Sequence, residues 1–148
     1  PATTTSSNAS RTMQVLVDTS VWSLALRRPV ASAAEGEPRE VALLRDLIGD
    51  GRAVMMGAIR QELLSGIRSA PQFEALRDAL SGFDDLPLER ADYERAAEFF
   101  NQCRSRGVQG SNTDFLICAA AAGRRLPILT TDRDFTLFKP HLPIELMG

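Results

Sequence analysis

Two short apolar runs, each followed by an aspartate, constrain the fold of this chain more than any other feature. Residues 13–17 (MQVLV) lead directly into Asp18, and residues 126–130 (LPILT) are followed two residues later by Asp132. Short apolar runs rich in β-branched residues are typical of strands buried on both faces of a sheet. Because open α/β sheets bind ligands at the carboxyl ends of their strands, we expect both aspartates in one crevice if the two strands are neighbours.

Segments with helical spacing of apolar residues separate these runs from further short apolar runs. We expect helices over residues 19–26, 38–49, 58–67, 71–83, 89–106 and 112–122, and one helical turn over 133–138. We expect a turn or short strand over 84–88 and strands over 53–56 and 143–146, of which the last would lie at a sheet edge. Strands that alternate with helices predict βαβ units and therefore an α/β fold with a parallel sheet. The chain contains no glycine-rich phosphate loop, which argues against nucleotide binding of the Walker or Rossmann type.

The composition is that of one ordinary globular domain. The chain has 148 residues, of which 44% are hydrophobic and 24% charged, so it can bury a core without disulfides or a structural metal. A formal net charge of −2 excludes a broadly basic nucleic-acid-binding surface, although not a local basic strip. The single histidine, His141, excludes a two-histidine ribonuclease and a histidine-rich zinc site. Cys103 and Cys118 are too few for a disulfide framework, and we expect both to be buried and reduced.

The first twelve residues differ in composition from the rest of the chain. Residues 1–12 (PATTTSSNASRT) are small and polar, without apolar periodicity, and we expect a flexible leader or a cloning remnant there. Residues 13–148 are expected to form a single domain. The chain shows no basic stretch followed by an apolar core, which is the pattern of a secretory signal. It also has no apolar run that is long enough to cross a membrane. The expected location is therefore the cytoplasm.

Four carboxylates occupy positions that a parallel sheet would bring to one edge. Asp18 and Asp132 follow strands, Glu62 lies in the helix after the second strand, and Asp114 lies in the first turn of a helix that runs back along the sheet. Each position also has an ordinary structural explanation. Asp114 would complement a helix dipole, Asp132 and Asp134 would form Asx turns, and Glu62 would be exposed to solvent. The shared placement at strand ends favours a cluster over four separate coincidences.

Such a cluster needs protons or a cation to be stable. Two like charges ~4 Å apart repel by about 4 kcal/mol at an effective dielectric constant of 20. Oxygen ligands without nearby imidazole or thiolate favour Mg²⁺ or Mn²⁺ over zinc. A hydrated Mg²⁺ ion can bind a phosphodiester oxygen and activate water. The hydroxyls that flank the acids are candidates for orienting them, namely those of Thr19, Ser20, Thr130 and Thr131.

Two arginines are candidates for contacts with phosphate groups. Arg133 lies between two acids of the predicted cluster, and Arg27 forms a basic pair with Arg28. The planar guanidinium fork of arginine suits phosphate oxygens. A solvated loop explains the pair at residues 27–28 equally well.

Four segments, in order, are similar to the motifs of the PIN domain family, and specifically of VapC-type toxins from bacterial toxin–antitoxin pairs. They are VLVDTSVW (15–22), AIRQELLSGI (58–67), SNTDFLICAAA (111–121) and ILTTDRDF (128–135). The resemblance extends over nearly the whole chain, from Met13 to Leu146. It implies a PIN-like three-layer fold, with a central, mostly parallel sheet of four or five strands flanked by helices.

The resemblance also implies roles for individual residues. Asp18 and Asp114 would be the primary ligands of Mg²⁺, which Mn²⁺ would be able to replace. Glu62 and Asp132 would complete the acidic pocket, partly through water. Ser20 would assist beside Asp18.

Two further residues are assigned less specifically by the same motifs. Asp134 matches the second acid of the closing motif, and the motif leaves open whether this residue or Asp132 lies nearer the metal. Thr131 would support the site from the same segment.

The implied activity is that of a toxin in a type II toxin–antitoxin system. The toxin would be a metal-dependent endoribonuclease that hydrolyses RNA phosphodiester bonds. Its implied partners are RNA, a VapB-type antitoxin whose C-terminal segment covers the active site, and a second copy of the toxin bound through helices of the first half of the chain.

Two alternatives remain open from the sequence. A catalytically idle PIN-like domain would serve only to bind a partner. A receiver-like phosphoacceptor would share the α/β pattern with acids at strand ends, but it needs a lysine beside them. The one lysine of this chain, Lys139, follows Asp134, the last acid of the predicted cluster, and precedes a proline.

Overall fold

The computed structural model describes residues 13–27 and 36–148. The leader expected over 1–12 and the position of Arg28 lie outside these ranges. In the described part of the chain, three parallel strands form one sheet in the order β2-β1-β3. The strands are β1 (Val15–Val17), β2 (Ala53–Val54) and β3 (Ile128–Leu129).

The central strand β1 is the best buried element of the sheet. Val15, Leu16 and Val17 all have 0% exposed surface, as the continuous apolar run predicted for a strand covered on both faces. Leu16 is in register with Val54 of β2 and with Ile128 of β3. The two strands that precede Asp18 and Asp132 are therefore neighbours, and their carboxyl ends share one edge of the sheet.

The sheet is narrower than the four or five strands that we expected. Single parallel bridges lie where further strands were predicted, namely Met55–Asp85 and Ile128–Leu146. On the first side, the Leu86 N–H donates to the Met55 carbonyl at 2.8 Å, but helical backbone begins at Gly57, so no further extended residue follows β2 for pairing. On the other side, the Leu126 N–H donates to the Ala121 carbonyl, so the last predicted strand is reduced to the pairing of Ile128 with Leu146.

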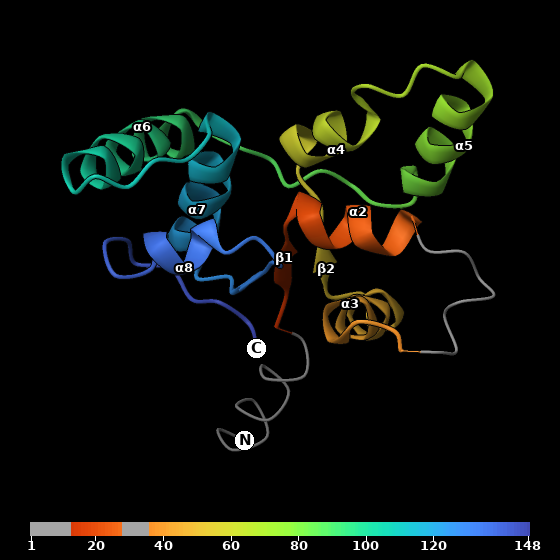
Figure 1. Cartoon of the computed structure of the whole chain (residues 1–148), viewed down its shortest axis with the longest axis horizontal. Coiled ribbons are helices and arrows are strands. Elements are labelled where there is room, and N and C mark those ends of the chain that lie inside the picture. The colour runs from red at the N-terminus through yellow and green to blue at the C-terminus, as the bar shows by residue number, and fades with distance from the viewer. Residues whose placement is uncertain (1–12, 28–35) are drawn as a thin grey trace.

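Helices cover the sheet on both sides, which gives three layers (Figure 1). The helices are α2 (Thr19–Arg27), α3 (Arg39–Gly49), α4 (Gly57–Leu64), α5 (Ala70–Leu80), α6 (Arg90–Ser105), α7 (Asn112–Arg124) and α8 (Asp134–Phe138). Helices α6, α7 and α8 lie on one side of the sheet, and α2 to α5 lie on the other. Each expected helix is present, so the α/β fold class is confirmed.

Two helix ends lie earlier than expected. Helix α4 was expected to reach Ile67 but ends at Leu64, where Ser65 adopts an extended conformation and Gly66 a positive φ of 86°. Helix α5 was expected to reach Phe83 but ends at Leu80. Phe83 fits the apolar spacing but packs against the core from the turn after α5, and Ile67 is half-buried after the end of α4. Spacing alone does not fix where helical backbone stops.

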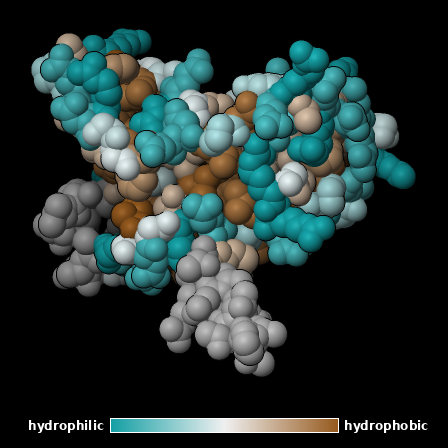
Figure 2. All heavy atoms as spheres, turned by 180° about the vertical axis from the view of Figure 1, so that it is seen from behind, coloured by the Kyte–Doolittle hydropathy of each residue, from teal (hydrophilic) through white to brown (hydrophobic). Residues whose placement is uncertain are grey.

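One contiguous core connects the layers. Trp22 is 2% exposed, and its indole N–H donates to the Val17 carbonyl at 3.1 Å. Both cysteines are free and buried, as predicted. From behind, apolar residues are visible in the centre of the molecule, between two lobes whose outer surfaces are mostly hydrophilic (Figure 2). No helix in the described ranges has the length and apolar character that a membrane span requires.

A buried ion pair joins the outer helix α6 to α7. Asp92, 4% exposed, receives two hydrogen bonds from Arg124, at 2.7 Å and 2.9 Å, and one from the Glu89 N–H at 2.8 Å. The hydrogen bonds from Arg124, together with the other donors and nearby guanidinium charges, outweigh burial and lower the pKa of Asp92 to about 2. This pair fixes the C-terminal end of α7 against the first turn of α6.

The Asp92–Arg124 pair predicts a specific pH dependence of stability. A carboxylate with a lowered pKa in the folded state stabilises the fold above its ordinary pKa, and this contribution is lost as the pH falls from ~5 towards 2. The shift from 3.8 to about 2 corresponds to about 2 kcal/mol at neutral pH. Chemical denaturation of Asp92→Asn should therefore show a lower free energy of unfolding at pH 7 and a smaller decrease between pH 5 and 2.

The matched control is Asp78→Asn, because Asp78 is exposed and makes no ion pair among the described residues. It should leave the pH profile nearly unchanged. Equal profiles for wild type and Asp92→Asn would contradict this account of the pair.

Candidate metal centre

Asp18 is held at the carboxyl end of β1 by hydroxyl groups from two segments. The Asp18 N–H donates to the Leu129 carbonyl at 2.9 Å, which continues the pairing of β1 with β3. Its Oδ2 accepts from the Ser20 hydroxyl at 2.7 Å and from the Thr130 hydroxyl at 2.8 Å. The side chain is 4% exposed and its orientation is fixed by both contacts.

The same two hydroxyls bind the backbone of the segment after β3. Ser20 Oγ accepts from the Thr131 N–H at 3.0 Å, and Thr130 Oγ1 accepts from the Asp132 N–H at 2.9 Å. Each hydroxyl gives its single proton to Asp18 and accepts a backbone N–H with a lone pair. The position of Asp132 is thereby coupled to that of Asp18.

The second oxygen of Asp18 is a free acceptor. No hydrogen bond from the described residues reaches Oδ1, although the side chain is nearly buried. A buried carboxylate oxygen without a hydrogen-bond donor lowers the stability of the fold unless a cation or a water molecule binds it. This orphaned oxygen is the observation that most directly indicates a cation site.

Asp114 lies in the first turn of α7, within a capping box. The Ser111 hydroxyl accepts from the Asp114 N–H at 3.0 Å, and Asp114 Oδ2 accepts from the Ser111 N–H at 3.2 Å. Burial raises the pKa of Asp114, and the negative charges of Asp18 and Asp132 raise it further, against the hydrogen bonds from Ser111. Asp18 and Asp132 are thus close enough to destabilise the charged form of Asp114.

Asp114, Asp132 and Asp134 form the tightest acidic group in the described part of the chain. One carboxylate oxygen from each lies within 4.8 Å of the others. The Asp134 N–H donates to Asp132 Oδ1 at 2.9 Å, in the Asx turn that starts α8. The turn considered as an alternative explanation is therefore present, and it presents both acids to Asp114.

Glu62 is tied to the same edge through Thr19. The Thr19 hydroxyl donates to Glu62 Oε1 at 2.6 Å, which places the exposed side chain of α4 next to the residue that follows Asp18. Glu62 and Asp18 are not members of the 4.8 Å group. The structure therefore separates the predicted acids into a tight trio that includes Asp134, a neighbouring buried Asp18, and Glu62 at the rim.

The chemistry of the donors fits a hard divalent cation. All candidate ligands are carboxylate oxygens, which suit Mg²⁺ and Mn²⁺. The thiol of Cys118 lies on the same helix as Asp114, but burial and the nearby carboxylate charge raise its pKa far above the usual range. A buried, protonated thiol is not a metal ligand. The residues present thus fit Mg²⁺ or Mn²⁺ and do not fit a thiolate-bound metal.

The supporting residues differ in what they contribute. Ser20 and Thr130 contact Asp18 directly, whereas Thr131 donates only its backbone N–H. The sequence analysis missed the contribution of Ser111, which holds Asp114 by two hydrogen bonds. The Ser-x-x-Asp spacing of a capping box is the signal that would have connected it to Asp114.

The two arginine candidates lie on different elements. Arg133 is exposed between Asp132 and Asp134, directly before α8. Arg27 lines a hollow of about 730 Å³ between α2, α4 and α5, whose rim includes Glu62. We call this the α2–α5 hollow.

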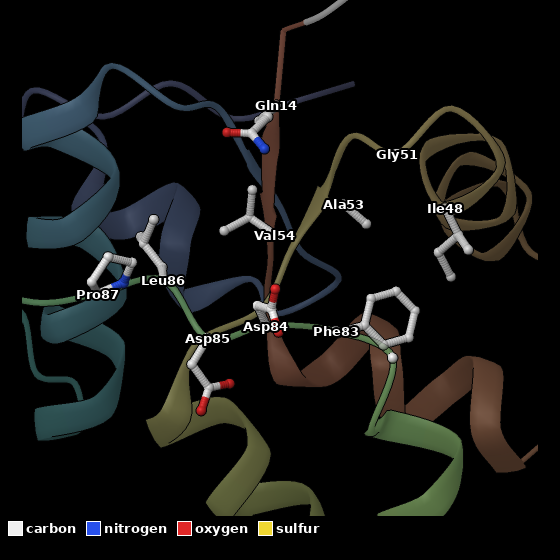
Figure 3. Close-up of a pocket in the computed structure, with 11 residues that line it drawn as sticks. Gln14, Ile48, Gly51, Ala53, Val54, Phe83, Asp84, Asp85, Leu86 and Pro87 are labelled. Carbon is white, nitrogen blue, oxygen red and sulfur yellow. The ribbon is translucent and has the colours of Figure 1, made fainter.

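Another hollow lies away from the acids. It has a volume of about 570 Å³ and follows the outer edge of β2, where Ala53, Val54 and Leu86 line it (Figure 3). Its carboxylates are Asp84 and Asp85, and the second of these is paired with Arg60. None of the predicted site residues lines this hollow, so it is not the candidate site.

Comparisons with known proteins identify a family and similar folds. The PIN domain family model matches residues 15–139. FitAcB from Neisseria gonorrhoeae has the same fold, with a TM-score of 0.68 and 20% sequence identity over 91% of this chain and 97% of the other.

Further solved structures share the fold at lower identity. VapBC-5 from Mycobacterium tuberculosis aligns with a TM-score of 0.63 and 19% identity, over 90% of this chain and 97% of the other. DNA-bound VapBC from Salmonella typhimurium aligns with a TM-score of 0.65 and 14% identity, over 91% and 97%. No curated protein matches the chain.

The mutual repulsion of the acids predicts opposite effects with and without metal. In EDTA, Asp114→Asn should raise the free energy of unfolding by about 1 kcal/mol, because one like charge is removed from the cluster while an acceptor for Ser111 remains. Addition of Mg²⁺ or Mn²⁺ should raise the Tm of the wild-type chain and leave that of the variant nearly unchanged. Differential scanning fluorimetry measures both effects.

Asp84→Asn is the matched control, because Asp84 is an exposed acid outside the cluster. It should keep the full response to metal. A wild-type chain whose Tm ignores both cations, or an Asp114→Asn variant that responds as wild type does, would rule out this cation site.

Proposed function

The chain belongs to the PIN domain family, and from this membership we propose that it is a metal-dependent endoribonuclease, the toxin of a type II toxin–antitoxin pair. The observation that carries the proposal is the nearly buried Asp18, whose Oδ1 has no donor among the described residues and faces no competing cation there. A scaffold that orients a carboxylate through two hydroxyls and leaves its other oxygen free is prepared to hold a cation.

We assign the cation to Asp18, Asp114, Asp132 and Asp134, with Glu62 at the rim, and propose Mg²⁺ with Mn²⁺ as a replacement. Such a cation supplies Lewis-acid chemistry, that is, activation of water and neutralisation of phosphodiester charge. Asp132 and Asp134 each have a carboxylate oxygen within 4.8 Å of one of Asp114, so we propose a role for both.

The side chains of this protein would perform three further tasks. Ser20 and Thr130 hold the carboxylate of Asp18 in one orientation. Asp114 is held by the Ser111 N–H and presents its carboxylate to the cation from the first turn of α7. Arg133 is exposed beside the acids and offers a cation to a phosphate oxygen of the substrate.

We propose a VapB-type antitoxin as the protein partner, since the solved relatives described above include VapBC toxin–antitoxin structures. The α2–α5 hollow supports this proposal, because its apolar lining opens beside Glu62. A segment seated there would reach the rim of the acids. We also propose a homodimer through helices of the first half of the chain.

The two other functional hypotheses receive less support. A receiver-like phosphoacceptor needs a lysine among the acids, but Lys139 lies beyond the end of α8, opposite to Asp134 at its start. A catalytically idle domain would have no need of the oriented Asp18, and cleavage assays separate it from the nuclease.

The first test is the loss of cleavage on removal of one charge. Asp18→Asn should reduce cleavage of single-stranded RNA in Mn²⁺ by more than about 100-fold, because the fixed ligand loses its negative charge. Circular dichroism should show an unchanged fold, and Asp84→Asn should cleave as wild type does. Full cleavage by Asp18→Asn, or cleavage that persists in EDTA, would exclude the proposed mechanism.

The second test concerns the partner surface. Ala79 is exposed on α5 and lines the α2–α5 hollow, whereas Ala91 is exposed on α6 outside it. Coexpression of the antitoxin encoded next to the toxin gene should suppress growth arrest by wild type and by Ala91→Glu, but not by Ala79→Glu. Both variants should cleave RNA normally. Equal suppression of both variants would place the antitoxin elsewhere.

A further inference from the structure

A groove on the outer side of α6 and α7 has no role in the site described so far. The two helices pack side by side (Figure 1), and the groove between them has a volume of about 450 Å³. We call it the α6–α7 groove. Its lining includes Tyr93, Phe100 and Asn101 from α6 and Asn112, Thr113 and Leu116 from α7.

The groove begins next to the acids. Asn112 and Thr113 directly precede Asp114 in the first turn of α7, so this turn presents one residue to the acidic cluster and two to the groove. On α6 the lining runs from Tyr93 to Asn101, which is about 12 Å of helix. A ligand that occupies the groove would therefore extend away from the cation site along α6.

The lining combines an exposed ring with unpaired amides. Tyr93 is 57% exposed, the most exposed of the large hydrophobic side chains in the described ranges. The side-chain amides of Asn101 and Asn112 make no hydrogen bond to the described residues, although both are at the groove. An aromatic face beside free amides matches a nucleobase, which stacks through its plane and hydrogen-bonds through its edge.

The charges around the groove also suit a nucleic acid. A smaller hollow of about 250 Å³ continues from the groove, since Phe100 and Phe115 line both. Among the described residues that line either hollow, Arg104 is the one with a charged side chain. The exposed acids on this stretch of α6, Glu94 and Glu98, line neither hollow.

We propose that the α6–α7 groove binds an unpaired base of the RNA next to the phosphodiester that is cleaved. Tyr93 stacks on the base, Asn101 and Asn112 contact its edge, and Arg104 contacts the phosphate that follows. This inference rests on the proposed ribonuclease function and adds a base-binding subsite to it.

The experiment compares a base with its absence at one position of the RNA. A single-stranded oligoribonucleotide and its single-abasic counterparts, with the abasic position moved along the chain, are cleaved by wild type, Tyr93→Ala and Leu137→Ala. Leu137 is the matched control, because it is 55% exposed on α8 and lines neither hollow. For wild type, kcat/KM should be about 5- to 10-fold lower than on the intact RNA when the abasic position lies at one place near the cleaved bond. This is the effect expected for the loss of one stacked base.

We expect Tyr93→Ala to cleave intact RNA and abasic RNA with the same kcat/KM, which should equal that of wild type on abasic RNA. Leu137→Ala should keep the wild-type difference between the two substrates. Asn101→Ala should change the preference among the four bases at that position. A photoreactive 4-thiouridine placed there, in RNA bound to Asp18→Asn, should cross-link to the tryptic peptides 91–95 and 96–104, which contain Tyr93 and Asn101.

Three results would overturn the inference. An unchanged abasic effect in Tyr93→Ala would show that the groove does not bind a base, with the ribonuclease function intact. A dimer that becomes a monomer in Tyr93→Ala, measured by light scattering, would make the groove a contact between copies of the chain. A wild-type chain that cleaves no RNA in Mn²⁺ would remove the proposed function and this subsite together.

Discussion

The hydrogen bonds to Asp18 Oδ2 connect the sheet to the segment that carries Asp132 and Asp134. Each donor hydroxyl, on Ser20 and on Thr130, also accepts a backbone N–H from the segment after β3. A single carboxylate oxygen thereby ties the ends of β1 and β3 and sets the turn that carries Asp132 and Asp134. The other oxygen of Asp18 stays free because both hydroxyl protons are already committed. The site is thus a direct product of two parallel strands ending side by side.

The sequence was sufficient to predict the parts of this arrangement that depend on local pattern. The apolar run before Asp18 predicted a strand buried on both faces, and the order of strands and helices predicted the parallel sheet. The ends of α4 and α5 were placed too late, because apolar spacing continues past both helices, to Ile67 beyond Gly66 and to Phe83, which packs on the core from a turn. The outer strands are missing because helical backbone begins at Gly57 and because the Leu126 N–H is bound by the Ala121 carbonyl, and the sequence pattern shows neither contact.

For the candidate site, the identity of the acids was predictable but their grouping was not. The sequence left Asp132 and Asp134 as alternatives, whereas one Asx turn directs both toward Asp114. Glu62 was expected among the ligands, but its distance from the trio depends on the hydrogen bond from Thr19. Contacts of this kind join residues far apart in the chain, and no spacing rule within one segment reveals them.

The unequal anchoring of the acids has a consequence for how such a centre can change over generations. Asp18 and Asp114 are also structural, since the first bridges two strands and the second begins α7. Glu62 is exposed and has one hydrogen-bonding partner among the described residues. Substitutions that inactivate the centre would therefore cost the least stability at Glu62. Inactive relatives are expected to have a changed α4 and an unchanged sheet edge.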